Sequence, residues 1–437
     1  MKAAPRTIVA SKPPDVVEVG RPPRSASRWP ARLREGAFWA GVSVLIALNL
    51  VRLKDTWPPA DPAAIALMLE RNRLDDAEQA LRERLRRAPF EGESRLKLAR
   101  LLLRRGDMAA ASAQFRLVPP WWPSKPEALY TEGQTAMAAG LAVQAEAAWR
   151  ACLADDPLHP APPRIFSVSA SELIKLLNLE GRPDDAIAAL WSISEASPEG
   201  EHPSILRSIM EIRLQSGKFP TDPASLATLQ RFAEADPDDV AARRALARAS
   251  RASGKPDEAL RWADSALAAR PDDLAARSER LAILNDQGDR AGFQAEVARL
   301  PSKPDVDASG QLWEDRGKAR EFAGDPAGVA ECYRRALTLR SADEALLERF
   351  AKVADHLGDL GEQARSLRQR AQAIRAARLA IPRVYRAYLD ASGENEGRPN
   401  ADRISLTQAR LAELATTLGW TREAAAWKRL GERPAKP

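Results

Sequence analysis

The sequence contains few aromatic residues, cysteines and histidines for its length. Aromatic residues make up 5% of the 437 residues, and there are only two cysteines and three histidines. Two thiols cannot form a disulfide framework or a multi-thiolate metal site. The histidines, His159, His202 and His356, lie far apart in the sequence, and two of them stand beside prolines. These shortages exclude a disulfide-rich domain and argue against a zinc centre or a histidine-based catalytic site.

Recognisable catalytic motifs are also missing. The sequence has no phosphate-binding glycine loop, no G-x-S-x-G elbow, no H-E-x-x-H and no paired C-x-x-C. We therefore predict no catalytic residues, no cofactor site and no metal site, and we expect that the protein is not an enzyme. Cys152 and Cys332 fall within helical segments, where we expect them to be small buried hydrophobic residues.

Long hydrophobic runs are absent except for one, the uncharged stretch of residues 36–51. Its 16 residues would span about 24 Å as a helix, slightly less than the ~30 Å bilayer core. Arg52 can snorkel, which extends the predicted transmembrane anchor to residues 36–53. A buried soluble helix and a cleaved signal peptide are the alternatives. The sequence favours an uncleaved anchor, because its leader is basic and rich in proline and no cleavage site follows the run.

Positive charge is concentrated before this run. Residues 1–54 contain ten Lys or Arg and three Asp or Glu, a net charge of +7, which leaves −1 on residues 55–437. The isoelectric point near 9.4 is therefore no sign of nucleic-acid binding, which requires cations on the folded surface. Residues 1–35 are predicted to be a disordered cytoplasmic tail, and the positive-inside rule places the remainder outside the cytoplasm, in a periplasm-like compartment.

A helical pattern with a period of about 34 residues begins at Asp61. A turn residue recurs at intervals of 34 to 41 residues, at Asn72, Gly106, Gly140, Gly181, Gly217, Gly254, Gly288, Gly324 and Gly358. Alanine stands five residues after the turn at Ala77, Ala111, Ala145, Ala186, Ala259 and, after Gly419, Ala424. The glycine permits a left-handed turn, and the small alanine allows two antiparallel helices to approach closely. Acidic doublets near the helix starts, such as Asp238-Asp239, are expected to cap helices and not to bind metal.

This pattern resembles the tetratricopeptide repeat family, whose unit is a helix–turn–helix of 34 residues. Glu132-Gly133 and Arg316-Gly317 stand where that family prefers Leu-Gly. The resemblance implies an all-α, right-handed superhelical solenoid of helical hairpins, whose first helices line a concave groove for protein or peptide partners. It is weakest in the units at Gly217 and beyond Gly358.

The resulting domain prediction has six segments. They are a tail (1–35), an anchor (36–53), a linker (54–60), a solenoid of about nine hairpins (61–380), a C-terminal helical pair or cap (381–431) and a short tail (432–437).

An arginine stripe is the first candidate binding surface. Arg244, Arg248 and Arg251 have i, i+4, i+7 spacing on one first helix. Arg207 on the preceding first helix, with Lys175 and Asn178 on the one before, extends the candidate groove. Such a surface would suit a carboxylate or an acidic segment. The alternative, which an arginine-rich protein favours, is a solvated helix face.

The loop Pro119–Pro123 contains two adjacent tryptophans, Trp121 and Trp122. One of them is a candidate exposed contact for a partner or a membrane surface; packing of both into the array is the favoured alternative.

We therefore expect a non-enzymatic, single-pass, membrane-anchored scaffold that binds partner proteins outside the cytoplasm. The alternatives are the same scaffold with cytoplasmic repeats, or a nucleic-acid or enzymatic role that the sequence does not reveal.

Overall fold

The computed structural model describes residues 61–154, 160–196, 203–215, 221–300, 309–357, 360–393 and 400–432. The chain divides into two units, Met1–Pro62 and Ala63–Pro437. Only the last two residues of the first unit are described, so the predicted tail, anchor and linker lie outside the described residues. Within the described part of the chain, no helix is both long and apolar enough to span a bilayer.

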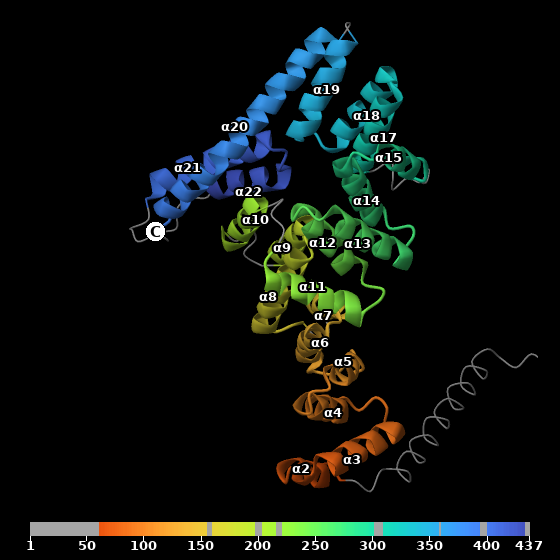
Figure 1. Ribbon diagram of the computed structural model, residues 1–437. Helices are drawn as coiled ribbons and strands as arrows, with labels where there is room; N and C mark the ends of the chain where they lie inside the picture. The colour runs from red at the N-terminus through yellow and green to blue at the C-terminus, as the bar shows by residue number, and fades with distance from the viewer. Residues whose placement is uncertain are drawn as a thin grey trace, which may run out of the picture. The chain divides into compact units, whose positions relative to one another are not determined.

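The second unit is entirely helical over its described residues, and its helices follow one another as stacked pairs (Figure 1). The first helices and their partners up to residue 196 are α2 (Pro62–Glu70), α3 (Leu74–Arg87), α4 (Gly92–Arg104), α5 (Met108–Arg116), α6 (Lys125–Ala139), α7 (Ala142–Leu153), α8 (Pro163–Leu179) and α9 (Pro183–Ala196). The middle helices are α10 (Pro203–Gln215), α11 (Pro223–Ala235), α12 (Val240–Ala252), α13 (Pro256–Ala269), α14 (Leu274–Gln287) and α15 (Arg290–Ala298). The last are α17 (Gly310–Ala323), α18 (Pro326–Leu339), α19 (Glu344–His356), α20 (Gly361–Ala391), α21 (Ala401–Thr417) and α22 (Thr421–Glu432).

The predicted turn residues have the expected backbone conformation. Positive φ angles occur at Asn72, Gly106, Gly140, Gly181, Gly254, Gly288, Gly324 and Gly419. Gly217 and Gly358 lie outside the described residues. Aspartates cap many of the following helices; Asp239, for example, accepts a hydrogen bond from the backbone N–H of Ala242 at 2.9 Å. The capping role predicted for this doublet is confirmed.

Small residues set how closely the paired helices approach. Ala77, Ala111, Ala145, Ala186 and Ala259 are completely buried. Gly133 lies against the indole of Trp149, and a Cβ atom at this position would be only 2.2 Å from Trp149 Nε1. Gly317 faces Tyr333 in the same way, at 2.3 Å. The glycines at the predicted family positions therefore make room for the large residue of the second helix.

The unit at Gly217 departs from the repeat. Helix α11 packs on α12, whereas α10 packs on α9 and on α22 near the end of the chain. Asp222, which replaces the expected crossing alanine, is the N-cap of α11 and accepts a hydrogen bond from the backbone N–H of Ser225 at 2.9 Å. The position that lacks the expected crossing alanine thus lies at the start of α11, a helix that packs on α12 and not on α10.

The last units also differ from the prediction. Helix α20 runs from Gly361 through Pro382 to Ala391, so the predicted boundary between residues 380 and 381 lies inside it. Buried residues at regular helical spacing, including Ile374, Ile381 and Tyr388, hold the helix together along its length. This packing compensates for the backbone hydrogen bond that proline cannot donate.

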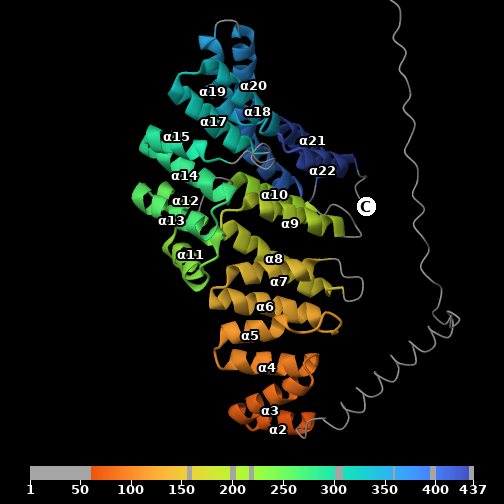
Figure 2. The ribbon, with the colours of Figure 1, turned by 90° about the vertical axis from the view of Figure 1, so that its right-hand side faces the viewer.

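The C-terminal pair, α21 and α22, returns to the middle of the array. Glu423 on α22 is only 2% exposed and accepts a hydrogen bond from Arg213 Nε on α10 at 3.0 Å. Arg422 stacks over Trp191 of α9, with its guanidinium carbon 4.6 Å from the ring centroid. Figure 1 and Figure 2 both show α22 beside α10. The C-terminal pair is therefore more than a cap on its sequence neighbour.

Replacing Gly133 with Ala should destabilise the protein by about 2–3 kcal/mol, because the added methyl group would overlap the buried Trp149 ring. Gly361→Ala is the matched control. A Cβ there meets no atom within 4 Å, so this change should be neutral. Urea unfolding followed by far-UV circular dichroism measures both; equal stabilities of the two variants would contradict the close-approach explanation.

Candidate functional site

A groove lies between the α17–α18 turn and one face of α19. Its volume is about 770 Å³. From α19 it is lined by Ala345, Glu348, Arg349, Lys352, Val353 and His356, and from the turn by Glu321, Gly324, Asp325, Pro326 and Val329. The α19 residues recur at intervals of three and four, so they share one helix face. This helix is the first of its pair, the position from which the family pattern predicts a binding groove.

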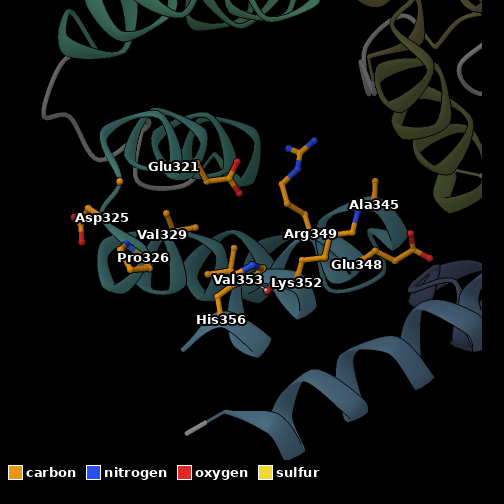
Figure 3. Close-up of a pocket in the computed structure, with 11 residues that line it drawn as sticks. Glu321, Asp325, Pro326, Val329, Ala345, Glu348, Arg349, Lys352, Val353 and His356 are labelled. Atoms are coloured by element: carbon orange, nitrogen blue, oxygen red, sulfur yellow. Dashed lines mark hydrogen bonds between the residues drawn. The ribbon is translucent and has the colours of Figure 1, made fainter. Parts of the chain in front are cut away.

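The groove has an apolar floor and charged walls. Figure 3 shows the side chains of Glu321 and Arg349 reaching toward the same space from different helices, with Val329 and Val353 on the helices below it. Glu321 accepts a hydrogen bond from the Tyr333 hydroxyl at 2.7 Å, and Arg349 pairs with Glu314 at 2.8 Å. The side chain of Lys352 is exposed and has no charged partner among the described residues. The groove therefore offers one uncommitted cation beside an apolar surface.

The arginine stripe on α12 faces carboxylates of the α14 segment. Arg244 Nη1 lies 3.5 Å from Asp273 Oδ1, and Arg251 Nε lies 3.8 Å from Asp286 Oδ2. Arg248 pairs with Glu279 and donates a second hydrogen bond to the Gly181 carbonyl at 2.6 Å. The three side chains do lie on one helix face as predicted. Their charge, however, is already balanced by the neighbouring first helix.

The other residues of the predicted groove lie on α8 and α10. The backbone carbonyl of Arg207, on α10, accepts a hydrogen bond from the Tyr385 hydroxyl of α20 at 3.4 Å. Lys175 is exposed on α8 and pairs with Glu172 at 2.8 Å. Asn178 is also exposed on α8. The candidate set is thus spread over three helices, α8, α10 and α12.

A buried ionic cluster lies next to the stripe. Arg182 pairs with Glu146 at 2.7 Å and with Glu180 at 2.8 Å. Glu180 is 1% exposed, and burial raises the pKa of its carboxyl to about 7 against the lowering effect of Arg182. Burial also raises the pKa of Glu146, but hydrogen bonds from Arg182 and Arg150 lower it overall. This cluster joins α7 and the α8–α9 turn, and Arg248 of α12 reaches the same turn.

The two tryptophans of the α5–α6 loop have different environments. The indole ring of Trp122 lies on Gly92, where a Cβ would be 2.3 Å from Trp122 Cδ2. Trp121 is 58% exposed and lies near Phe90, with ring centroids 6.0 Å apart. One tryptophan thus joins neighbouring hairpins and the other is open to contact.

Side chains suited to catalysis or metal binding are dispersed in the described residues. No three His, Cys, Asp or Glu side chains there are grouped as metal ligands. Cys152 and Cys332 are buried, as predicted, and burial raises the pKa of both thiols. His356 is exposed on α19, whereas His159 and His202 lie outside the described residues.

The repeat pattern, its left-handed turns and its buried crossing residues agree with a family match. Residues 82–379, more than half of the chain, match the tetratricopeptide repeat. The chain belongs to the tetratricopeptide repeat family.

Solved structures of tetratricopeptide repeat proteins are similar to this chain at low sequence identity. PilF of Pseudomonas aeruginosa is 16% identical, with a TM-score of 0.32 over 57% of this chain and 93% of its own. A tetratricopeptide repeat protein from Parabacteroides merdae is 18% identical, with a TM-score of 0.29 over 60% of this chain and 98% of its own. The Cut9–Hcn1 structure of the APC/C is 13% identical, with a TM-score of 0.33 over 84% of this chain and 79% of its own. No curated protein is detectably similar in sequence.

Sequence reasoning missed the groove on α19 and the buried cluster around Arg182. In the tetratricopeptide repeat pattern, residues Ala345 to His356 formed an ordinary first helix, and Glu180-Gly181-Arg182 an ordinary turn. The available signal for the groove was the spacing of Arg349, Lys352 and His356 on one face of a predicted first helix. For the cluster, the signal was a carboxylate directly before a turn glycine.

The raised pKa of Glu180 predicts a pH-dependent stability. A folded-state pKa of about 7, above the ordinary value, means that the native protein binds a proton that the unfolded chain releases. The contribution of Glu180 to stability is therefore present at low pH and lost as the pH rises toward 7. Glu180→Gln should stabilise the protein by up to about 3 kcal/mol at pH 8, with little gain near pH 4.

Glu146→Gln is the control in the same cluster. The pKa of Glu146 is lowered, so its contribution to stability is present above its ordinary pKa and lost as the pH falls. This variant should therefore be destabilised at pH 8. Urea unfolding at both pH values measures the two effects, and the same sign for both variants would refute the assignment.

Proposed function

We propose that this protein is a non-enzymatic, membrane-anchored scaffold that binds a segment of a partner protein in the groove between the α17–α18 turn and α19. The observation that carries the proposal is the groove itself, which has a volume of about 770 Å³ and is lined on one side by a single face of a first helix. A recess of this size accommodates one or two side chains of an extended chain.

The chemistry of the groove favours a particular kind of segment. Val329 and Val353 form an apolar floor, which supports binding of an apolar side chain. Lys352 beside them has no charged partner among the described residues, which supports an acidic residue or a terminal carboxylate nearby. The preferred ligand is therefore an extended peptide with an apolar residue flanked by a negative charge.

The arginine stripe is a weaker candidate for the same role. Arg244, Arg248 and Arg251 already pair with Asp273, Glu279 and Asp286. An acidic partner would have to displace these carboxylates, which lie on a neighbouring helix of the same array. The uncommitted charge of Lys352 favours the α19 groove over the stripe.

Membrane attachment and orientation complete the proposal. Residues 36–53 are the anchor, residues 1–35 lie in the cytoplasm and the repeats lie outside it. The support is the distribution of charge, +7 on residues 1–54 and −1 on the remainder, under the positive-inside rule.

A photo-crosslinking residue at Ala345 should capture a partner protein in cells of the native host, and Lys352→Glu should reduce that capture at least tenfold. Ala345 is exposed at the edge of the groove. The control places the same residue at Arg334, which is half-exposed on α18, pairs with Glu331 and is not a groove residue. Equal capture from both positions, or capture that Lys352→Glu does not change, would overturn the groove assignment.

A reporter enzyme that is active only outside the cytoplasm, fused after Pro437, should be active. Its counterpart that is active only in the cytoplasm should be inactive at the same position. The reverse result would favour the alternative in which the anchored repeats are cytoplasmic.

A further inference from the structure

Exposed apolar side chains gather on two neighbouring loops near the start of the array. Phe90, in the α3–α4 loop, is 69% exposed, and Trp121, in the α5–α6 loop, is 58% exposed. Their ring centroids are 6.0 Å apart. Leu117, at the start of the α5–α6 loop, is 53% exposed. We call Phe90 and Trp121 the aromatic patch.

The loop that presents Trp121 is held firmly. Trp122 packs on Gly92 of the preceding pair, and the Lys125 ammonium donates hydrogen bonds to the Val118 carbonyl at 2.8 Å and to the Arg116 carbonyl at 3.1 Å. A fixed loop keeps the Trp121 ring in water although no packing inside the array requires it. Large aromatic rings held this way are typical of contact surfaces.

The patch lies at the end of the hairpins from which the chain enters the array. In an antiparallel pair, the start of the first helix and the end of the second lie at the same end. Pro62, the α3–α4 loop and the α5–α6 loop therefore share one end, and the turns at Asn72 and Gly106 share the other. Figure 2 shows the start of α2 and these two loops on the same side of the stacked helices.

The predicted anchor ends at residue 53, and eight residues, 54–61, separate it from Pro62. Eight residues extend to at most about 29 Å. The proposed anchor would therefore tether this end of the array to the bilayer through a short linker. The patch is also bordered by cations. Arg86 and Arg87 of α3 both pair with Glu83, and the exposed Arg116 of α5 directly precedes Leu117 in the chain.

We propose that the aromatic patch inserts into the interfacial region of the membrane that holds the anchor, so that the first two helical pairs rest on the lipid surface. This inference depends on the proposed anchor. Tryptophan and phenylalanine partition into the headgroup region, and neighbouring arginines attract anionic lipids. The binding partner of the aromatic patch is therefore a bilayer that contains anionic lipid. Contact with this bilayer would orient the repeats relative to the membrane.

The test uses the full-length protein reconstituted into vesicles of phosphatidylethanolamine and phosphatidylglycerol. Single spin labels are placed at Phe90→Cys, at Trp121→Cys and, as a control, at Ala109→Cys. Ala109 is exposed in the first turn of α5, at the opposite end of the hairpins. The native thiols of Cys152 and Cys332 are buried, and labelling of the unsubstituted chain measures their background.

Collision rates with oxygen, which concentrates in lipid, and with a water-soluble nickel chelate give the position of each label. Labels at 90 and 121 should collide more often with oxygen, and the label at 109 more often with nickel. Circular dichroism checks that the variants are folded. If the labels at 90 and 121 are as accessible to nickel as the label at 109, the patch does not insert and the inference is wrong.

Flotation separates this inference from the anchor. Protein that floats with vesicles after a high-salt, alkaline wash is anchored, and the labels then decide whether the patch inserts. If the protein does not float with the vesicles, the proposed anchor is wrong, and the inference that depends on it loses its basis. If the protein floats but the labels at 90 and 121 remain accessible to the nickel chelate, the proposed anchor stands and only the insertion of the aromatic patch is refuted.

Discussion

The close approach of two helices at a small residue is the constraint on which the rest of the structure depends. Alanine at the crossing, or glycine beneath a large ring as in Gly133 under Trp149, brings the paired helices together. A left-handed residue must then turn the chain back within one position of the helix end. These two requirements fix the spacing between turn and crossing, so each unit positions the first helix of the next. A stacked row of first helices follows directly.

Stacking the first helices brings their charged faces into contact, which explains why the repeat body is nearly neutral. The arginines of α12 meet the carboxylates of α14. Glu314 of α17 likewise pairs with Lys318 of its own helix and with Arg340 and Arg349 from beyond α18. Ion pairs of this kind contribute specificity between neighbouring units more than net stability. An isolated cation such as Lys352 therefore differs from its surroundings, which is why the groove on α19 is a stronger candidate than a longer row of arginines.

Local features of the fold were predictable from the sequence, whereas contacts between distant units were not. Left-handed turns, crossing alanines and aspartate caps each depend on a few adjacent residues, so their signals are visible in one sequence. The contact of Arg213 with Glu423 joins residues 210 positions apart, and each residue alone is an ordinary member of a helix. The arginine stripe shows the same limit. Its spacing predicted one helix face correctly, but its acidic partners lie on another unit, about 30 residues further along the chain.

The return of the C-terminal pair has a consequence for the groove. Gly419, in the α21–α22 turn, lies against Ala342 of the α18–α19 loop, where a Cβ on the glycine would be 3.1 Å from the alanine side chain. Helix α22 is in turn held by α10 through Glu423 and Arg213. The start of α19 is therefore supported by a unit other than its sequence neighbours. In a simple solenoid each unit contacts only adjacent units, and a groove can flex with them. Here the additional support limits that flexing, so a bound segment would lose little free energy to ordering α19, and its affinity would depend mainly on contacts within the groove.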